Sequence, residues 1–435
     1  MLGVAVLVLL GWCGVACSGG SVGTSDPAGK PVVVNVPGDS PTITAALQKV
    51  ADDGLVLVHP GNYPESVTVE VPGVTIRGSD RNAVVIDGQG VRSSGLVVSA
   101  PGVTISNLTV ENHTFYGVLV TGDPGAARGP LGSGYTAPDP GTSQPVQRFR
   151  VDHVTAVNNG LYGIYAFYAQ HGVILDSYAS GSADSGFYVG QCRECDIVVR
   201  GNVAERNAVG FENANASDSV YILENRWSGN RVGVTLISSY QEALTPQRGN
   251  TVVGNVVTNN TSGDSPTQAD GGFGIGVGIS GGRDNVVQRN LITGNPRAGV
   301  LINGAEDLPA TGNQLLDNVL DDNGVDVADV SSEQTPSSGN CVSPGDVTAL
   351  PQALAAAACP AGSATSAGAA ARDLPTVAVP PGVSFLDVRS PRPQPSLEHT
   401  TDTPAASLPA TVGPPDLSTI MVPSADYLAA LTGTS

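Results

Sequence analysis

Short runs of alternating apolar and polar residues recur through the middle of the chain, separated by Gly, Asn and Asp. Alternation with a period of two predicts short β-strands, and no run is long enough to predict a helix. Glycines open four successive runs at Gly163, Gly186, Gly210 and Gly233, in steps of 23, 24 and 23 residues. A repeat of this length predicts a solenoid whose coils pair their strands with those of the neighbouring coils.

A second repeat places two asparagines on either side of four other residues. It occurs at Asn107/Asn112, Asn202/Asn207, Asn225/Asn230, Asn255/Asn260, Asn290/Asn295 and Asn318/Asn323, with His153/Asn158 and Ser177/Ser182 as substitutes in the same frame. Asn tolerates left-handed backbone conformations and can bond to its equivalent in the next coil, so we expect ladders at the coil corners. About eleven coils, ~4.8 Å apart, would give a rod roughly 50 Å long.

Three segments near the start of the repeat region carry a resemblance to a known family. They are Pro41-Thr42-Ile43-Thr44-Ala45-Ala46-Leu47, Val56-Leu57-Val58-His59-Pro60-Gly61-Asn62-Tyr63-Pro64-Glu65 and Val74-Thr75-Ile76-Arg77-Gly78. With the repeats, they resemble the pectin-lyase-like superfamily in its bacterial exported form. The resemblance implies an all-β, single-stranded right-handed parallel β-helix, which we assign to residues 32–340. Because this superfamily includes lyases, hydrolases, esterases, epimerases and non-catalytic proteins, the resemblance specifies the fold and not the function.

A short helix is predicted before the first coil. Asp39-Ser40-Pro41 offers capping side chains and a proline suited to the first helical turn. Ile43, Leu47 and Val50 lie on one helical face, and Gly54 can end the helix. We expect this helix to cover the open end of the coil stack.

The first residues indicate export. Residues 2–10 (LGVAVLVLL) are apolar but too few to span a bilayer. The stretch Gly14-Val15-Ala16-Cys17 resembles a bacterial lipoprotein signal, which implies a signal peptide over residues 1–16, lipidation of Cys17 as a membrane anchor, and a flexible linker over residues 17–31. Two features depart from that pattern: Gly14 replaces a branched aliphatic residue, and no Lys or Arg precedes the apolar stretch. Plain secretion is the alternative, and in both cases the protein works outside the cytoplasm.

The charge of the chain limits the classes of partner that it can bind. The sequence has 39 acidic and 20 basic side chains, a formal charge of −19, and its two lysines are Lys30 and Lys49. This balance argues against binding to nucleic acid or docking on anionic lipid. Residues 360–435 are rich in Ala, Pro, Ser and Thr with few aromatic residues, which predicts a largely disordered tail.

Four cysteines follow Cys17, and four cysteines allow three pairings. An oxidising compartment favours a Cys341–Cys359 disulfide that clips residues 341–359, with Cys192 and Cys195 paired locally or free. The Cys192-Arg193-Glu194-Cys195 spacing also suits redox or metal chemistry, but a zinc site needs two more ligands at matching spacing. We therefore predict no metal site and no cofactor.

Aromatic and amide side chains gather where a ligand could bind. When the runs are aligned on their glycines, Tyr165, Tyr188 and Glu212 occupy an outward position one coil apart, and Tyr168, Gln191 and Asn215 form a parallel column three residues later. Exposed tyrosines beside carboxylates and amides are typical of sugar-binding surfaces. The alternative is that the tyrosines pack beneath the Gly/Pro-rich excursion at residues 121–147. A second excursion, residues 238–249, leaves from the equivalent strand.

Catalysis has weaker support in the sequence. Glycoside hydrolysis requires two carboxylates across a cleft, and Glu212 and Asp184, with His153 nearby, are the candidates. Their frame lacks the paired-aspartate, Gly-His-Gly and Arg-x-Lys signatures of polygalacturonases, and the coils lack the lysine that a lyase could use as a base.

Three functions therefore stay open. The first is an envelope-anchored protein that binds an extracellular polysaccharide, with or without cleaving it. The second is a non-catalytic spacer or adhesion module. The third follows a resemblance to periplasmic β-helix proteins that help to mature copper enzymes, and it requires reduced Cys192 and Cys195 close to His171. Surface tyrosines favour the first function, a buried aromatic cluster the second and free thiols the third.

Overall fold

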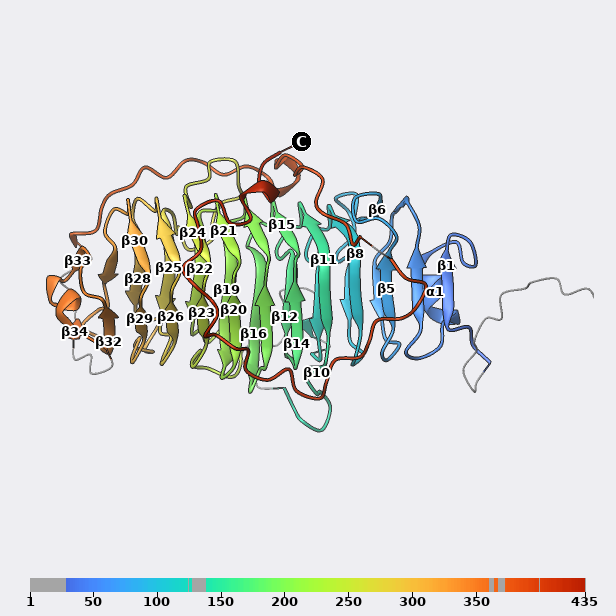
Figure 1. The fold of residues 1–435 in the computed structure, drawn as a ribbon, viewed down its shortest axis with the longest axis horizontal. Helices are drawn as coiled ribbons and strands as arrows, with labels where there is room; N and C mark the ends of the chain where they lie inside the picture. Colours follow the sequence, from blue (N-terminus) through green and yellow to red (C-terminus); the bar gives the residue numbers. More distant parts are fainter. Residues whose placement is uncertain are drawn as a thin grey trace, which may run out of the picture.

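The computed structural model describes residues 29–123, 125–126, 138–359, 364–366, 372–398 and 400–434. The predicted signal peptide, the lipidation site Cys17 and most of the predicted linker lie outside these residues. The described chain winds into one right-handed parallel β-helix (Figure 1). One face of the helix is a sheet of 11 parallel strands, one from each coil, which agrees with the predicted number of coils.

Each complete coil contributes strands to three faces. The first face consists of β1 (Val33–Val36), β2 (Leu55–Val58), β5 (Thr75–Gly78), the first parts of β8 (Thr104–Glu111) and β11 (Arg150–Val157), β14 (Gly172–Leu175), β17 (Ile197–Arg200), β20 (Val220–Leu223), β23 (Thr251–Val253), β26 (Val286–Gln288), β29 (Gln314–Leu316) and β32 (Ser337–Ser343). The second face consists of β3 (Gly61–Tyr63), β6 (Val84–Asp87), the later parts of β8 and β11, β15 (Tyr178–Ser180), β18 (Val203–Glu205), β21 (Arg226–Ser228), β24 (Val256–Thr258), β27 (Leu291–Thr293) and β30 (Val319–Asp321).

The third face carries the two long excursions. It consists of β4 (Val67–Val69), β7 (Leu96–Val98), β9 (Val118–Thr121), β12 (Ile164–Phe167), β16 (Ser185–Arg193), β19 (Val209–Ser217), β22 (Val232–Ile237), β25 (Ile275–Ser280), β28 (Ala298–Asn303), β31 (Val327–Asp329) and β33 (Ala349–Leu350). Outside the faces, β10 (Val146–Gln147) pairs with β13 (Ala169–Gln170), and β34 (Ala364–Ser366) pairs antiparallel with β32. Among the described residues, three 3₁₀ turns lie near the C-terminus: η2 (Gln352–Ala356), η4 (Phe385–Asp387) and η5 (Ala429–Leu431).

The interior of the coils is apolar and continuous. Along the third face, equivalent inward-facing side chains stack from coil to coil in the order Val118, Ile164, Phe187, Phe211 and Val234. Trp227 lies beside Phe187 and Phe211, with ring centroids 5.4 and 5.5 Å away. These six side chains are at most 1% exposed. The glycine alignment therefore predicted correctly which residues fill the core.

Buried asparagine ladders join the coils at their corners. The first runs through Asn202, Asn225, Asn255, Asn290 and Asn318, and the second through Asn207, Asn230, Asn260, Asn295 and Asn323. At each step the side-chain Oδ1 accepts the backbone N–H and the Nδ2–H of the asparagine in the preceding coil, at 2.9–3.3 Å. A third ladder, which the sequence did not predict, runs through Asn285, Asn313 and Asn340.

In the earlier coils the predicted frame is wrong by one residue. His153 and Asn158 adopt left-handed conformations with φ of +50° and +53°, and so do Asn107 and Asn112. The ladder residue after Asn158 is Asn159, whose Oδ1 accepts a backbone N–H from the preceding coil at 3.2 Å. The residue before each ladder residue has a left-handed backbone. Asparagine tolerates this conformation, so it can occupy either of the two adjacent positions, and the sequence alone does not show which one forms the ladder.

A short helix covers the first coil, as predicted, but it is shorter than expected. α1 (Ile43–Lys49) packs against β1, β2 and β4. It begins two residues after Pro41, because Thr42 is the N-cap and accepts the backbone N–H of Ala45 at 3.0 Å. It ends at Lys49, well before Gly54, and the next residue, Val50, has an extended backbone. None of the helices within the described residues is long and apolar enough to cross a membrane.

The C-terminal segment runs back over the coils (Figure 1). Residues 372–398 and 400–434, here called the C-terminal strap, carry little regular structure, in keeping with their composition. The strap reaches the early coils, where Ala405 N–H donates to Thr75 Oγ1 at 2.8 Å. It then returns along the body until Thr434 forms a β-bridge with Pro391. Composition predicted a largely disordered tail, whereas the described residues lack regular structure but follow a defined path against the coils.

Arginines of the coils hold the strap by its backbone carbonyls. The donors are Arg77 to Thr401 and Thr403, Arg81 to Pro395, Arg226 to Ala425 and Tyr427, Arg231 to Pro380 and Pro381, and Arg289 to Leu417, all at 2.9–3.0 Å. Four of these five arginines are at most 9% exposed. Strap residues Leu408, Val412, Leu417 and Ile420 also cover an apolar patch formed by Val173, Val198, Leu223 and Val253.

Candidate functional site

An acid-lined groove of about 570 Å³ lies on the third face. Its floor is formed by Tyr188, Glu212 and Thr235, which occupy equivalent positions on β16, β19 and β22. Its walls come from residues 238–242, 268–270 and 303–306. Its acidic residues are Asp184, Glu212, Glu242, Asp270 and Glu306, and we call this site the acidic groove.

Two predicted catalytic carboxyls, Asp184 and Glu212, meet in the acidic groove. They are hydrogen-bonded to each other, and the Ser185 hydroxyl lies 2.6 Å from Glu212 Oε2 and 3.2 Å from Asp184 Oδ1. Burial raises the pKa of both carboxyls, and the neighbouring Asp184 carboxylate raises that of Glu212 further, to well above its usual range. Two like charges this close and this buried cannot both ionise, so the pair retains a proton near neutral pH.

A third carboxyl in the groove, that of Glu242, also holds a proton. Burial raises the pKa of Glu242 from an ordinary value of 4.5 to about 8, against the lowering effect of its hydrogen bond from the Tyr188 hydroxyl. Its second oxygen, Oε2, is buried and has no hydrogen-bond partner among the described residues. At neutral pH the groove therefore contains carboxylic acids that can donate as well as accept hydrogen bonds.

This retained proton predicts a pH dependence of stability. Between about pH 4.5 and pH 8 the folded protein keeps the Glu242 proton while the unfolded chain has lost it, so stability falls as the pH rises. We expect a decrease of roughly 1 kcal/mol in unfolding free energy per pH unit in this window, and little dependence on Glu242 outside it. Thermal unfolding at pH 5, 6, 7 and 8 measures the slope, and Glu242→Gln should reduce it. A wild-type melting temperature that rises steadily to pH 8 would contradict the assignment.

The expectation that Tyr165 and Tyr188 are exposed is wrong. The structure places them opposite each other on β12 and β16, but they are only 5% and 1% exposed. Tyr116 and Tyr162 add a second aromatic layer, with centroids 5.1 and 4.5 Å from the Tyr165 ring. Tyr188 still contributes to the groove, but neither ring offers a free face for sugar stacking.

The second predicted ligand-binding column anchors loops. Tyr168, Gln191 and Asn215 all have left-handed backbones, with φ of +54°, +47° and +46°, so they lie at a corner of the coils. Gln191 Oε1 accepts the backbone N–H of Ala243 at 2.8 Å, and Asn215 Nδ2 donates to the Glu242 carbonyl at 2.9 Å. Gln191 and Asn215 are fully buried, so this column does not face solvent as we expected. Its amides instead fix the loop that carries Glu242.

His153 does not join the predicted catalytic carboxyls. It lies on β11, in a separate cavity of about 410 Å³ between the first face and the C-terminal strap. Its Nδ1 is 3.5 Å from Asp152 Oδ1, and Arg150 and Asp176 line the same cavity. The sequence placed His153 near these carboxyls but could not show that β11 carries it away from the third face.

The acidic groove has parts that the sequence reasoning missed. Glu242 and Asp270 come from the second excursion and from residues 261–272, and Glu306 follows β28. The excursion at residues 238–249 was visible in the sequence, and its departure from the strand equivalent to the one before residues 121–147 could have pointed to Glu242. The sequence gave no indication that Tyr162 belongs to the site, because Tyr162 lies in the turn before β12 and not on a strand.

Comparison with known proteins assigns the chain to a family. The family described as "Periplasmic copper-binding protein (NosD)" matches residues 61–263 and 153–337, which together span more than half of the 435 residues. The chain belongs to the NosD family. No curated protein matches the sequence.

Solved structures similar to this NosD-family chain include polysaccharide-modifying enzymes. The A-module of the mannuronan C-5 epimerase AlgE6 from Azotobacter vinelandii is 17% identical, with a TM-score of 0.49 over 66% of this chain and 78% of that chain. The AlgE4 A-module from the same organism is 18% identical, with a TM-score of 0.48 over 67% and 79%. The pectate lyase Pel9A is 15% identical, with a TM-score of 0.42 over 60% and 75%.

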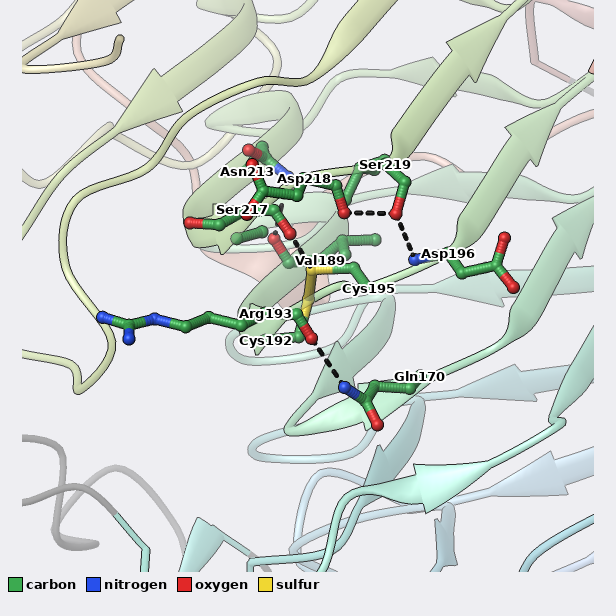
Figure 2. Close-up of a disulfide and its surroundings, with 12 residues drawn as sticks. Gln170, Val189, Cys192, Arg193, Cys195, Asp196, Asn213, Ser217, Asp218 and Ser219 are labelled. Carbon is green, nitrogen blue, oxygen red and sulfur yellow. Dashed lines mark hydrogen bonds between the residues drawn. A yellow bond between two sulfur atoms is a disulfide. The ribbon is translucent and has the colours of Figure 1, made fainter. Parts of the chain in front are cut away.

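The described residues of this NosD-family chain do not fit a copper(I) site. Cys192 and Cys195 form a disulfide and are at most 2% exposed, so no thiolate is available (Figure 2). His171 Nδ1 pairs instead with Asp196 at 2.8 Å. A second disulfide joins Cys341 and Cys359. No three His, Cys, Asp or Glu side chains converge as possible metal ligands in the described part of the chain.

Proposed function

We propose that this NosD-family protein is exported and binds a polysaccharide in the acidic groove. The observation that carries the proposal is the set of side chains gathered there on a rigid face. The carboxyls of the Asp184/Glu212 pair and of Glu242 form hydrogen bonds, and the Tyr162 and Tyr188 rings lie beside them. The groove's volume of about 570 Å³ lies in the usual range for ligand pockets. Sugars require many donors and acceptors, which carboxylic acids, hydroxyls and amides supply.

The same groups would support acid–base cleavage of a glycosidic bond. A carboxyl that keeps its proton at neutral pH can act as a general acid toward a leaving oxygen, and its ionised partner can stabilise positive charge on the sugar. We assign these roles to Glu212 and Asp184 as a pair. A lyase reaction has less support, because no Lys, Arg or His belongs to the described residues that line the groove.

The test is binding of the full-length protein to a glycan array, followed by titration with each glycan that binds. Glu212→Gln keeps a neutral side chain of the same shape, but this side chain cannot share a proton with Asp184. We expect it to weaken binding by about tenfold, the effect of one buried hydrogen bond. Glu194→Gln, at an exposed corner after β16, is the matched control and should bind normally.

Absence of glycan binding by the folded protein would overturn the proposal. The protein would then be a non-catalytic structural or adhesion module, which the buried aromatic cluster around Tyr165 would suit.

The proposal includes a lipid anchor at Cys17 that holds the protein on the extracellular side of the membrane. The sequence pattern at residues 14–17 supports it. We expect Cys17→Ala to move the protein from the detergent phase to the aqueous phase in Triton X-114 partitioning. Unchanged partitioning of this variant would mean that Cys17 is not the anchor.

Copper handling is the second candidate, because the description of the family names copper binding. The Cys192–Cys195 disulfide and its burial weigh against it. Stoichiometric copper(I) binding by the full-length protein, lost in Cys192→Ser, would favour it over the polysaccharide proposal.

A further inference from the structure

The charge of the acidic groove is strongly one-sided. Five carboxyl groups line it, and no Arg, Lys or His side chain belongs to its described lining. Asp270 and Glu306, at the rim, are exposed. The half-buried Asp184/Glu212 pair adds further negative charge. A ligand that enters this groove meets several carboxylates and no compensating cation.

From this lining we infer that the acidic groove takes a glycan whose sugars carry protonated amino groups. The inference rests on the proposed function and specifies its substrate class. A polyuronate carries one carboxylate per sugar and would be repelled by Asp270 and Glu306. A neutral glycan offers these carboxylates hydroxyl donors but no positive charge, whereas an ammonium group offers both donors and charge.

A second, independent feature is a pair of polar atoms in the groove without hydrogen-bond partners among the described residues. Thr235 Oγ1 has no hydrogen-bond partner among the described residues, although its side chain belongs to a residue only 9% exposed and lines the groove. Glu242 Oε2 is likewise buried without a partner. An ammonium group supplies three donors and no acceptor, so it can satisfy an acceptor such as Thr235 Oγ1.

The half-buried ring of Tyr162 completes the site. Tyr162 and Tyr188 both line the groove, with centroids 4.8 Å apart and planes at 45°. Tyr162 is only half-buried, so part of its ring borders the groove. Faces of aromatic rings attract ammonium groups, and carboxylates beside the rings strengthen this attraction. The groove therefore combines the two features with which proteins bind amines.

The experiment titrates the full-length protein with three tetrasaccharides of matched length. They are the β-1,4-linked glucosamine tetramer, its fully N-acetylated form and a mannuronate tetramer. We expect roughly tenfold tighter binding of the glucosamine tetramer than of the acetylated form, because acetylation removes the charge and its ion pairs. We expect no measurable binding of the mannuronate tetramer, and weaker glucosamine binding at high salt.

Two rim variants separate the charge effect from folding. Asp270→Asn and Glu306→Gln change exposed side chains, so both proteins should fold, and each should weaken glucosamine binding several-fold. Glu194→Gln should leave it unchanged. Equal binding of the acetylated and free tetramers, or tighter binding of mannuronate, would overturn the amino-sugar inference while the proposed function stands. Failure of all three tetramers and of the glycan array would overturn both.

Discussion

Deletion of residues 372–435 is expected to destabilise the whole β-helix and to make it aggregate. The strap supplies carbonyl acceptors to five arginines of the coils, four of which are at most 9% exposed. Each charge-assisted hydrogen bond contributes about 1.5–3 kcal/mol, although water recovers part of that loss once the arginines are uncovered. Uncovering Val173, Val198, Leu223 and Val253 also exposes an apolar patch on an otherwise polar rod.

We therefore expect the truncated protein to lose several kcal/mol of stability and to bind hydrophobic dyes. Thermal unfolding and light scattering of the full-length and truncated proteins measure both effects. A point variant tests the mechanism with less disturbance: Arg231→Lys keeps the charge but cannot reach both Pro380 and Pro381, and should lower the melting temperature. Arg200→Lys, whose parent side chain is 53% exposed, is the control. A truncated protein with an unchanged melting temperature would show that the strap is not part of the folded body.

The second large effect is expected from Asn255→Ala, in the middle of the first ladder. Asn255 accepts two hydrogen bonds from Asn225 and donates to Asn290 and to the carbonyl of Ile222. The variant leaves two donors of Asn225 and one carbonyl buried without partners, in a place that water does not reach. An unsatisfied buried polar group costs about 1–3 kcal/mol, so the loss from three such groups should be about 3 kcal/mol or more.

Chemical denaturation measures this loss against Asn318→Ala as the control. Asn318 ends the same ladder and is only half-buried, so water can replace part of its hydrogen bonding and the loss should be clearly smaller. Equal effects of the two substitutions would mean that burial does not set the strength of the ladder.

The sequence predicted the coils well because their determinants are local and repeat. The glycines at Gly163, Gly186, Gly210 and Gly233 set the register that places Phe187 and Phe211 inside. Where prediction went wrong by one residue, as at Asn158, the cause was chemical: one residue type suits two adjacent positions.

The candidate site was predictable only in part, because its cover comes from far along the chain. Tyr188 and Glu212 were placed correctly as neighbours, but Tyr188 is closed off by Glu242, 54 residues away. The partners of the strap are farther still, since Arg77 and Thr401 are 324 residues apart. An arginine in an outward position looks solvated in the sequence, and no local pattern shows that a distant carbonyl will cover it.

The asparagine ladders have a consequence for how this architecture can diversify. Successive asparagines in the first ladder bond across 23, 30, 35 and 28 residues, yet each step has the same hydrogen bonds. The stacking of coils is thus independent of how much chain leaves the body between them. New loops can be inserted, lengthened or exchanged above the third face without a change in the scaffold, so the walls of the groove can evolve, or be engineered, as replaceable parts.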